Sequence, residues 1–160
     1  MEISRPEHYY RVALERIRQA QYLYRESQSY ALAIYVAGVA VESMLRAFRA
    51  KTTREFESRH DLSALFIESG MVQLGTDKLR AKGWSEDDII RHTRTMRVAV
   101  NHVYMIWHNN YRFASEQRLL AHVKKMKLYR GLKGDILKAN ALHLIDAARV
   151  FIDKGVLQWD

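Results

Sequence analysis

The chain of 160 residues contains no cysteine, and Pro6 is its single proline. Without cysteine, disulfides and thiol catalysis are excluded, and a metal site would need histidine and carboxylate side chains alone. Glycine is also modest, with seven residues, while helix formers dominate the composition. This balance favours long helices joined by short links over a sandwich or barrel. We expect one domain over residues 1–160, long enough to bury a core without covalent links.

Long apolar runs are also missing. The longest, from Tyr30 to Val41, has about twelve residues, whereas about twenty are needed to cross a bilayer. We therefore expect a buried core helix there. The N-terminal sequence MEISRPEHYYRV lacks the apolar segment of a signal peptide. Together these features predict a soluble, cytoplasmic protein that is not exported.

The motifs of several enzyme classes are absent as well. The sequence contains no glycine-rich phosphate loop, no G-x-S-x-G and no H-E-x-x-H, so nucleoside triphosphatase, serine hydrolase and zinc protease activities find no support. Asp88 and His92 stand one helical turn apart, but no third ligand follows at helical spacing. The sequence therefore predicts neither a metal site nor a bound cofactor.

What the chain does have is positive charge. Its formal net charge is +8, which favours acidic partners, nucleic acid first. The alternative is that the basic residues serve solubility alone.

Hydrophobic residues recur at steps of three and four, the period of a buried helix face. They predict helices over about 6–27, 29–51, 61–69, 85–108, 115–130 and 135–155. Residues 71–84 are expected to form a loop with one helical piece around 77–82. Residues suited to helix caps precede four of the helices, namely Ser29, Asp61, Ser85 and Ser115. The predicted fold is an all-α, up-and-down bundle of five to six helices.

Glu42 lies in the most apolar of these helices. A buried carboxylate needs a partner, and Arg46 follows one turn later. Glu42 is therefore either half of a structural ion pair or the acid of a functional site. The ion pair is favoured, because a perturbed catalytic group usually needs more than one buried charge nearby.

The same helix and the segment after it carry a recognisable pattern. A helix of the form A-x-Y-x-A-G-x-A-V-E-x-x-L-(K/R)-A, followed by H-D-L-x-x-L, is common in the HEPN domain family. The matching residues here are Ala33, Tyr35, Ala37, Gly38, Ala40, Val41, Glu42, Leu45, Arg46, Ala47, His60, Asp61, Leu62 and Leu65. The chain thus resembles these prokaryotic helical bundles over about residues 9–153. The resemblance implies a HEPN-like bundle, a homodimer formed through its long helices and a nucleotidyltransferase as partner protein.

Nucleases of the HEPN family carry an arginine, four to six residues, a histidine and often a tyrosine two residues later. Arg97, His102 and Tyr104 meet this spacing. The resemblance implies metal-independent RNA cleavage, in which His102 moves a proton and Arg97 stabilises charge on the phosphate. Val98 departs from the polar residue usual after the arginine. Five residues of helix turn through about 500°, so the two side chains point about 140° apart. They converge only across a second subunit or through a distorted helix, and the alternative is an exposed arginine and a packed histidine.

Basic residues gather in two further places. Arg91, Arg94 and Arg97 stand on adjacent turns and can bind phosphates in a row, and a second surface comprises Lys124, Lys125, Lys127 and Arg130. Both can equally be ordinary solvated faces.

The segment from Trp107 to Phe113 resembles another HEPN feature, a tryptophan followed by arginine beside an aromatic residue. We expect Trp107 to pack in the core. Arg112, between Tyr111 and Phe113, could bind a phosphate or stack on a base, cap the preceding helix, or pair with Glu42.

Three functions follow from these features. The first is an RNA- or nucleotide-binding module that acts with a nucleotidyltransferase. The second is a metal-independent endoribonuclease of the toxin–antitoxin or defence type. The third is a scaffold subunit without a ligand. The sequence alone does not decide whether the chain is an enzyme.

Overall fold

The computed structural model describes residues 5–53 and 59–160. Within these residues the chain forms seven α-helices, one short 3-10 helix and no strand, which confirms the all-α class. The elements are α1 (Pro6–Arg25), α2 (Tyr30–Thr52), α3 (Leu62–Glu68), α4 (Met71–Ala81), α5 (Glu86–Ile106), η1 (Asn109–Phe113), α6 (Glu116–Lys125) and α7 (Ile136–Trp159).

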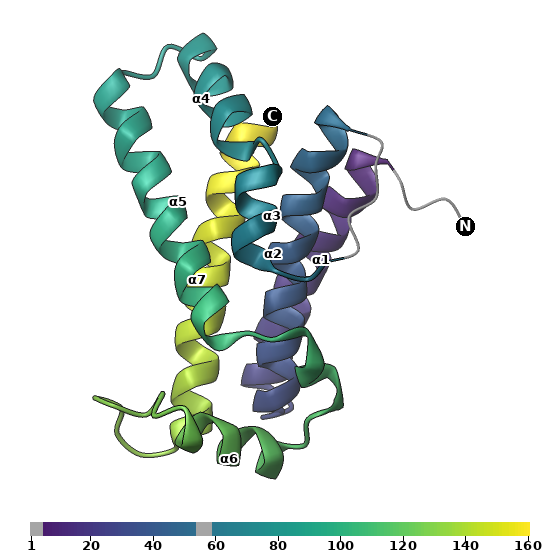
Figure 1. Cartoon of the computed structure of the whole chain (residues 1–160), viewed down its shortest axis with the longest axis vertical. Coiled ribbons are helices and arrows are strands. Elements are labelled where there is room, and N and C mark those ends of the chain that lie inside the picture. Colours follow the sequence, from purple (N-terminus) through teal and green to yellow (C-terminus); the bar gives the residue numbers. More distant parts are fainter. Residues whose placement is uncertain (1–4, 54–58) are drawn as a thin grey trace.

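Four long helices, α1, α2, α5 and α7, run along the longest axis of the molecule, and α6 lies across one end of them (Figure 1). α2 packs against both α1 and α7, and α5 packs against α7. The shorter helices α3 and α4 both contact α5. After α5 the chain passes over α2 through η1 and then enters α6 (Figure 1). This crossing segment shapes the surface described in the next subsection.

α2 is the central helix, as the sequence predicted. Its alanines Ala33, Ala37 and Ala40 are fully buried, which lets the neighbouring helices approach closely. By length and composition alone α2 could cross a membrane, but 78% of its most apolar stretch is buried inside the bundle. It is therefore the core helix of the domain.

The expectation of a loop over residues 71–84 is wrong, because α4 fills most of that range. Met71, Gly75 and Leu79 recur at steps of four and form its buried face. Glycine usually weakens a helix, which is why the sequence reads as a loop here. At this position it is needed for packing, since a Cβ atom on residue 75 would lie 2.1 Å from Cδ of Gln158. α4 thus adds a helix to those expected.

The last helix extends to Trp159 and does not end near Gly155 as expected. Its final turn is held by aromatic contacts that the helical period does not reveal. The ring of Trp159 stacks on Tyr10 at a centroid distance of 4.5 Å, and Nζ of Lys51 lies 3.4 Å from its centroid. The end of α7 is thereby joined to α1 and α2.

Three of the four predicted caps form. The side chains of Asp61, Ser85 and Ser115 accept hydrogen bonds from backbone N–H groups in the first turns of α3, α5 and α6. Ser29 does not cap α2 with its side chain. Instead, the N–H of Ala31 donates to Oε1 of Glu116 at 2.7 Å, so that α6 supplies the acceptor for the start of α2.

Candidate nucleic-acid interface

Trp107, the residue directly after α5, packs closely against α2. Trp107 is buried and its Nε1 donates to the carbonyl oxygen of Tyr35 at 3.0 Å. Its indole lies on Gly38, where a Cβ atom would be 2.0 Å from Cδ1 of the ring. The predicted packing role of Trp107 is confirmed, and the glycine of the HEPN-like motif is explained. This contact positions η1 over α2.

A groove of about 910 Å³ lies beside this crossing. We call it the α5–α6 groove. It is bounded by the end of α5, by η1 and by α6, and its lining residues are Tyr104, Met105, Ile106, Trp107, His108, Asn110, Tyr111, Phe113, Ala114, Arg118, Leu119, His122 and Met126.

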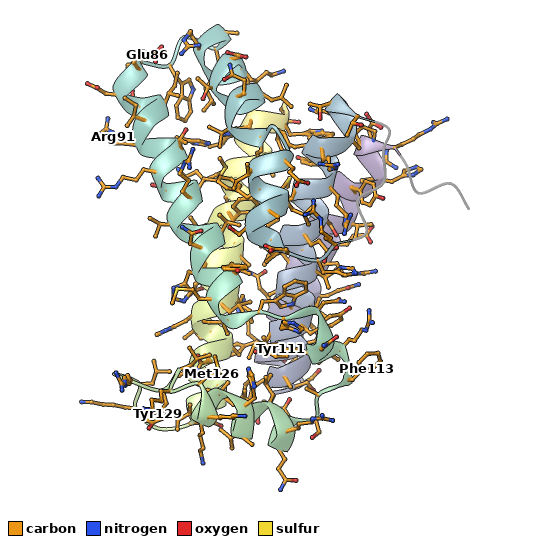
Figure 2. The ribbon with its side chains drawn as sticks, in the orientation of Figure 1. Glu86, Arg91, Tyr111, Phe113, Met126 and Tyr129 are labelled. Atoms are coloured by element: carbon orange, nitrogen blue, oxygen red, sulfur yellow. The ribbon has the colours of Figure 1, made fainter. Side chains whose placement is uncertain are left out.

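Large apolar side chains stand exposed along the groove. Phe113 is 72% exposed and Met105 71%, and Tyr104 and Met126 are also exposed. Figure 2 places Tyr111, Phe113 and Met126 at the same end of the bundle, opposite the end that carries Glu86 and Arg91. Exposed aromatic and methionine side chains around one hollow are typical of a binding surface.

Cationic and aromatic groups alternate along the rim. The guanidinium carbon of Arg112 lies 4.6 Å from the centroid of the Phe113 ring. Arg118 and His122 line the groove from successive turns of α6, and the ring of His122 meets Tyr111 at 5.7 Å. Burial raises the pKa of Tyr111, so its hydroxyl remains a hydrogen-bond donor at neutral pH. The rim thus offers both stacking surfaces and charge for an anionic ligand.

A buried ion pair lies beside the crossing segment. Nε of Arg46 donates to Oε1 of Glu42 at 2.8 Å, which confirms the predicted pairing of Glu42 with Arg46. Arg46 also donates to the carbonyl oxygen of Arg59 at 2.9 Å. Arg112 does not join this pair, because it lies over Phe113. A second partner of Glu42 is His60, whose Nδ1 is 2.9 Å from the same oxygen.

His60 stands at the edge of a smaller cavity of about 430 Å³, which we call the His60 hollow. Its lining residues are His60, Asp61, Leu62, Tyr104, Trp107, His108, Asn109 and Asn110. Tyr104, Trp107, His108 and Asn110 also line the α5–α6 groove, so the two cavities adjoin at the end of α5.

The predicted nuclease residues do not come together within one chain. The guanidinium of Arg97 lies over the ring of Phe66, on the side of α5 that faces α3. His102 lies on the side facing α7, with its ring 6.4 Å from that of His143. Burial, and the charge of His143, lower the pKa of His102. Tyr104 points into the two cavities at the end of α5, on the side away from His102.

The other predicted arginines lie farther along α5. Arg91 pairs with Asp88 and projects into solvent toward the end of the bundle remote from the groove (Figure 2). Arg94 lines two shallow cavities, one beside α7 and one beside α4. Ten residues of helix, about 15 Å, separate Arg94 from Tyr104. This row of arginines is therefore a surface separate from the groove.

The predicted lysine surface lies at the end of α6. Its residues are all exposed: Lys124, Lys125, Lys127 and Arg130. Lys127 has a left-handed backbone, with φ of 56°, and its N–H donates to the carbonyl oxygen of Lys124. The turn closes α6 and directs the cluster away from the core, next to Met126 of the groove.

Arg118, His122 and His60 are groove and hollow residues that the sequence analysis missed. Arg118 and His122 share the helical spacing of four, but only the packing of α6 near the end of α5 makes them part of the groove. His60 was quoted only as part of a motif, and it meets Glu42 across 18 positions. Local spacing contains no signal for a contact at that separation.

Comparison with known proteins identifies the family. The sequence profile of the HEPN domain matches residues 6–100, which is more than half of the chain. The chain therefore belongs to the HEPN domain family. No significant match was found among curated proteins or among solved structures.

Proposed function

We propose that this HEPN domain is a binding module for single-stranded RNA or its nucleotides, and that the ligand lies in the α5–α6 groove. The observation that carries the proposal is the size and chemistry of that groove: about 910 Å³, lined by the exposed ring of Phe113 from η1 and by Arg118 and His122 from α6. Unpaired bases stack on aromatic rings, and guanidinium groups bind the phosphates between them.

The charge of the whole chain supports this ligand. A net charge of +8 attracts polyanions from a distance. The lysine surface at the end of α6 extends from the groove beside Met126, so a strand leaving the groove would pass over further cations. A duplex is a poorer ligand, because its bases are already stacked and cannot reach the aromatic rings.

We also propose that the domain forms a homodimer through the outer face of α5. Ile90, Val98 and Met105 recur there at steps of eight and seven and are 61%, 63% and 71% exposed. Although Arg94 and Asn101 are exposed between them, a stripe of large apolar side chains on the surface of a helix is typical of a contact surface. Ile90 and Met105 lie at nearly equal distances along the helix on either side of Val98. This spacing suits an isologous contact, in which the stripe of one subunit packs against the same stripe of a second copy.

The family resemblance supports two finer proposals. The partner of the homodimer is a nucleotidyltransferase, and the complex acts in the cytoplasm. Co-purification of the chain with such an enzyme from its own cells would test the partnership, and absence of the enzyme from a crosslinked complex would contradict it.

A metal-independent endoribonuclease is the second candidate. Arg97 and His102 flank the exposed stripe of α5 from opposite sides, so only a paired subunit could bring one beside the other. The test is incubation of end-labelled RNA with the protein in a chelator. Cleavage that His102→Ala abolishes would support the enzyme, whereas intact RNA at a protein concentration that saturates binding would exclude it.

The binding module is tested by fluorescence anisotropy with a labelled uridine pentamer. We expect binding that weakens steeply with salt, and Phe113→Ala and Arg118→Ala should each weaken it about tenfold, as loss of one stacked base or one phosphate contact does. Arg11→Ala on α1 is the matched control, since it removes the same charge outside both cavities and should leave affinity nearly unchanged. Equal losses in all three variants would reject the groove as the binding site.

A further inference from the structure

The His60 hollow is lined by two histidines that make opposite hydrogen bonds through Nδ1. Glu42 is an acceptor only, because its carboxylate is paired with Arg46. The Nδ1 atom of His60, 2.9 Å from Oε1 of Glu42, must therefore carry the proton in this contact. In the neutral imidazole that leaves Nε2 as a hydrogen-bond acceptor.

His108 has the other tautomer. Its Nδ1 accepts a hydrogen bond from the N–H of Asn110 at 3.1 Å, so the ring proton is on Nε2. His60 and His108 line the same hollow. Within the described residues, Nε2 of His60 has no hydrogen-bond partner and the side chain is 43% exposed. In their neutral forms the two rings thus offer a ligand one acceptor, Nε2 of His60, and one donor, Nε2 of His108.

These two groups match a ribonucleotide. A ribose 2′-hydroxyl can donate to Nε2 of His60, and a neighbouring phosphate oxygen can accept from Nε2 of His108. The volume of about 430 Å³ is within the range that small ligands occupy. The hollow also adjoins the α5–α6 groove through Tyr104 and Trp107, so a strand with its bases in the groove could place one sugar and phosphate here.

We propose that the His60 hollow holds the ribose and phosphate of one nucleotide of the bound strand and selects RNA over DNA through the 2′-hydroxyl. The proposal rests on the proposed function, because it assumes that a strand lies in the groove. Glu42 acts as the positioning residue, since it fixes the tautomer and the orientation of His60. The 2′-hydroxyl is the group by which a protein distinguishes the two nucleic acids at a given position.

The experiment compares a uridine pentamer with a deoxyuridine pentamer of the same length, which differ only in the 2′-hydroxyls. Wild-type protein should bind the uridine pentamer about three- to tenfold more tightly, the range of one hydrogen bond. His60→Ala should bring the two affinities together, mainly by weakening RNA binding. His108→Ala should weaken both pentamers by similar factors, because both contain the phosphate.

Two controls separate selectivity from folding. His8→Ala removes an exposed histidine on α1 and should keep the preference for RNA. A 2′-O-methyl uridine pentamer, which cannot donate from the 2′-oxygen, should bind wild-type protein like the deoxyuridine pentamer, and this comparison needs no variant. Equal binding of RNA and DNA by wild-type protein, or a preference that survives His60→Ala, would overturn this inference alone. Binding of neither pentamer would overturn the proposed function as well.

Discussion

The indole of Trp107 lies flat against the backbone of Gly38, and its Nε1 donates to the carbonyl oxygen of Tyr35 at 3.0 Å. One residue at the end of α5 is thereby fixed to the middle of the central helix. Because Trp107 also forms a wall of both cavities, the same contact that closes the core sets the direction of η1 and the shape of the proposed binding surface.

Gly38→Ala should displace Trp107 and destabilise the domain by about 2 to 3 kcal/mol, the usual cost of overpacking together with a lost hydrogen bond. Urea unfolding measures the loss, and a red shift of tryptophan emission reports exposure of the indole. Gly155→Ala is the matched control. There the new Cβ atom would be 3.0 Å from the flexible side chain of Met44, so a change below about 1 kcal/mol is expected. Equal losses of stability in the two variants would show that the contact between the indole and Gly38 does not contribute more than ordinary core packing.

Glu42→Ala should cost about 3 kcal/mol, since it leaves the guanidinium of Arg46 buried without its carboxylate. The double variant Glu42→Met with Arg46→Met should recover most of this loss, because it removes both charges and retains apolar volume. Chemical denaturation of the wild type, the single variants and the double variant checks the cycle. A double variant as unstable as the sum of the single ones would contradict an energetic coupling between Glu42 and Arg46.

His92 should make stability depend on pH. Burial, and then the charge of Lys154, lower its pKa to about 4, and both ring nitrogens lack a partner within the described residues. The unfolded chain takes up a proton near pH 6.5, whereas the folded chain resists it until about pH 4. The contribution of neutral His92 to the free energy of unfolding is therefore fully present above pH 6.5. It is lost as the pH falls toward 4, by about 3 kcal/mol in total.

His92→Leu is the variant that isolates this effect, since the acidic side chains of the protein titrate in both forms. Unfolding free energies measured at pH 7 and pH 4.5 should differ more for the wild type than for the variant. If both proteins lose the same stability over this interval, His92 is not the group responsible.

Val98→Glu should convert the proposed homodimer to a monomer, because it places like charges against each other on the apolar stripe of α5. Light scattering coupled to size exclusion measures the mass. Val98 is 63% exposed in a single chain, so the variant should still fold. Ile67→Glu, on α3 and 78% exposed, is the control that should leave the mass unchanged. A wild-type protein that elutes as a monomer at high concentration would contradict the dimer itself.

Periodicity was sufficient to predict the long helices, because their buried faces repeat without interruption. The buried position of α2 followed from its apolar run and its small residues. It also predicted that Arg97 and His102 diverge, since their angular separation follows from the helix itself. The same reasoning failed at α4, where Gly75 looks like a helix breaker until Gln158 is seen to lie on it. Helix propensity alone does not show that a glycine is needed because a neighbouring side chain packs against it.

The binding surface was harder to predict from the sequence than the helices were. The partnership of Glu42 with Arg46 follows from a spacing of one turn, but the contact of Glu42 with His60 joins residues 18 positions apart, which no local spacing indicates. The α5–α6 groove likewise requires the crossing over α2 that Trp107 fixes. Residues of α5 meet residues of η1 and α6 there only after tertiary packing, so no local pattern could have brought Tyr104 and Met105 together with His122.

The most direct test is an NMR titration of isotopically labelled protein with the uridine pentamer, in which backbone and side-chain shifts locate the bound strand. A groove that binds RNA predicts the largest changes at Phe113, Arg118, His122 and the indole N–H of Trp107, with little change on α1. Changes confined to Arg91 and Arg94, or spread evenly over all exposed cations, would contradict it.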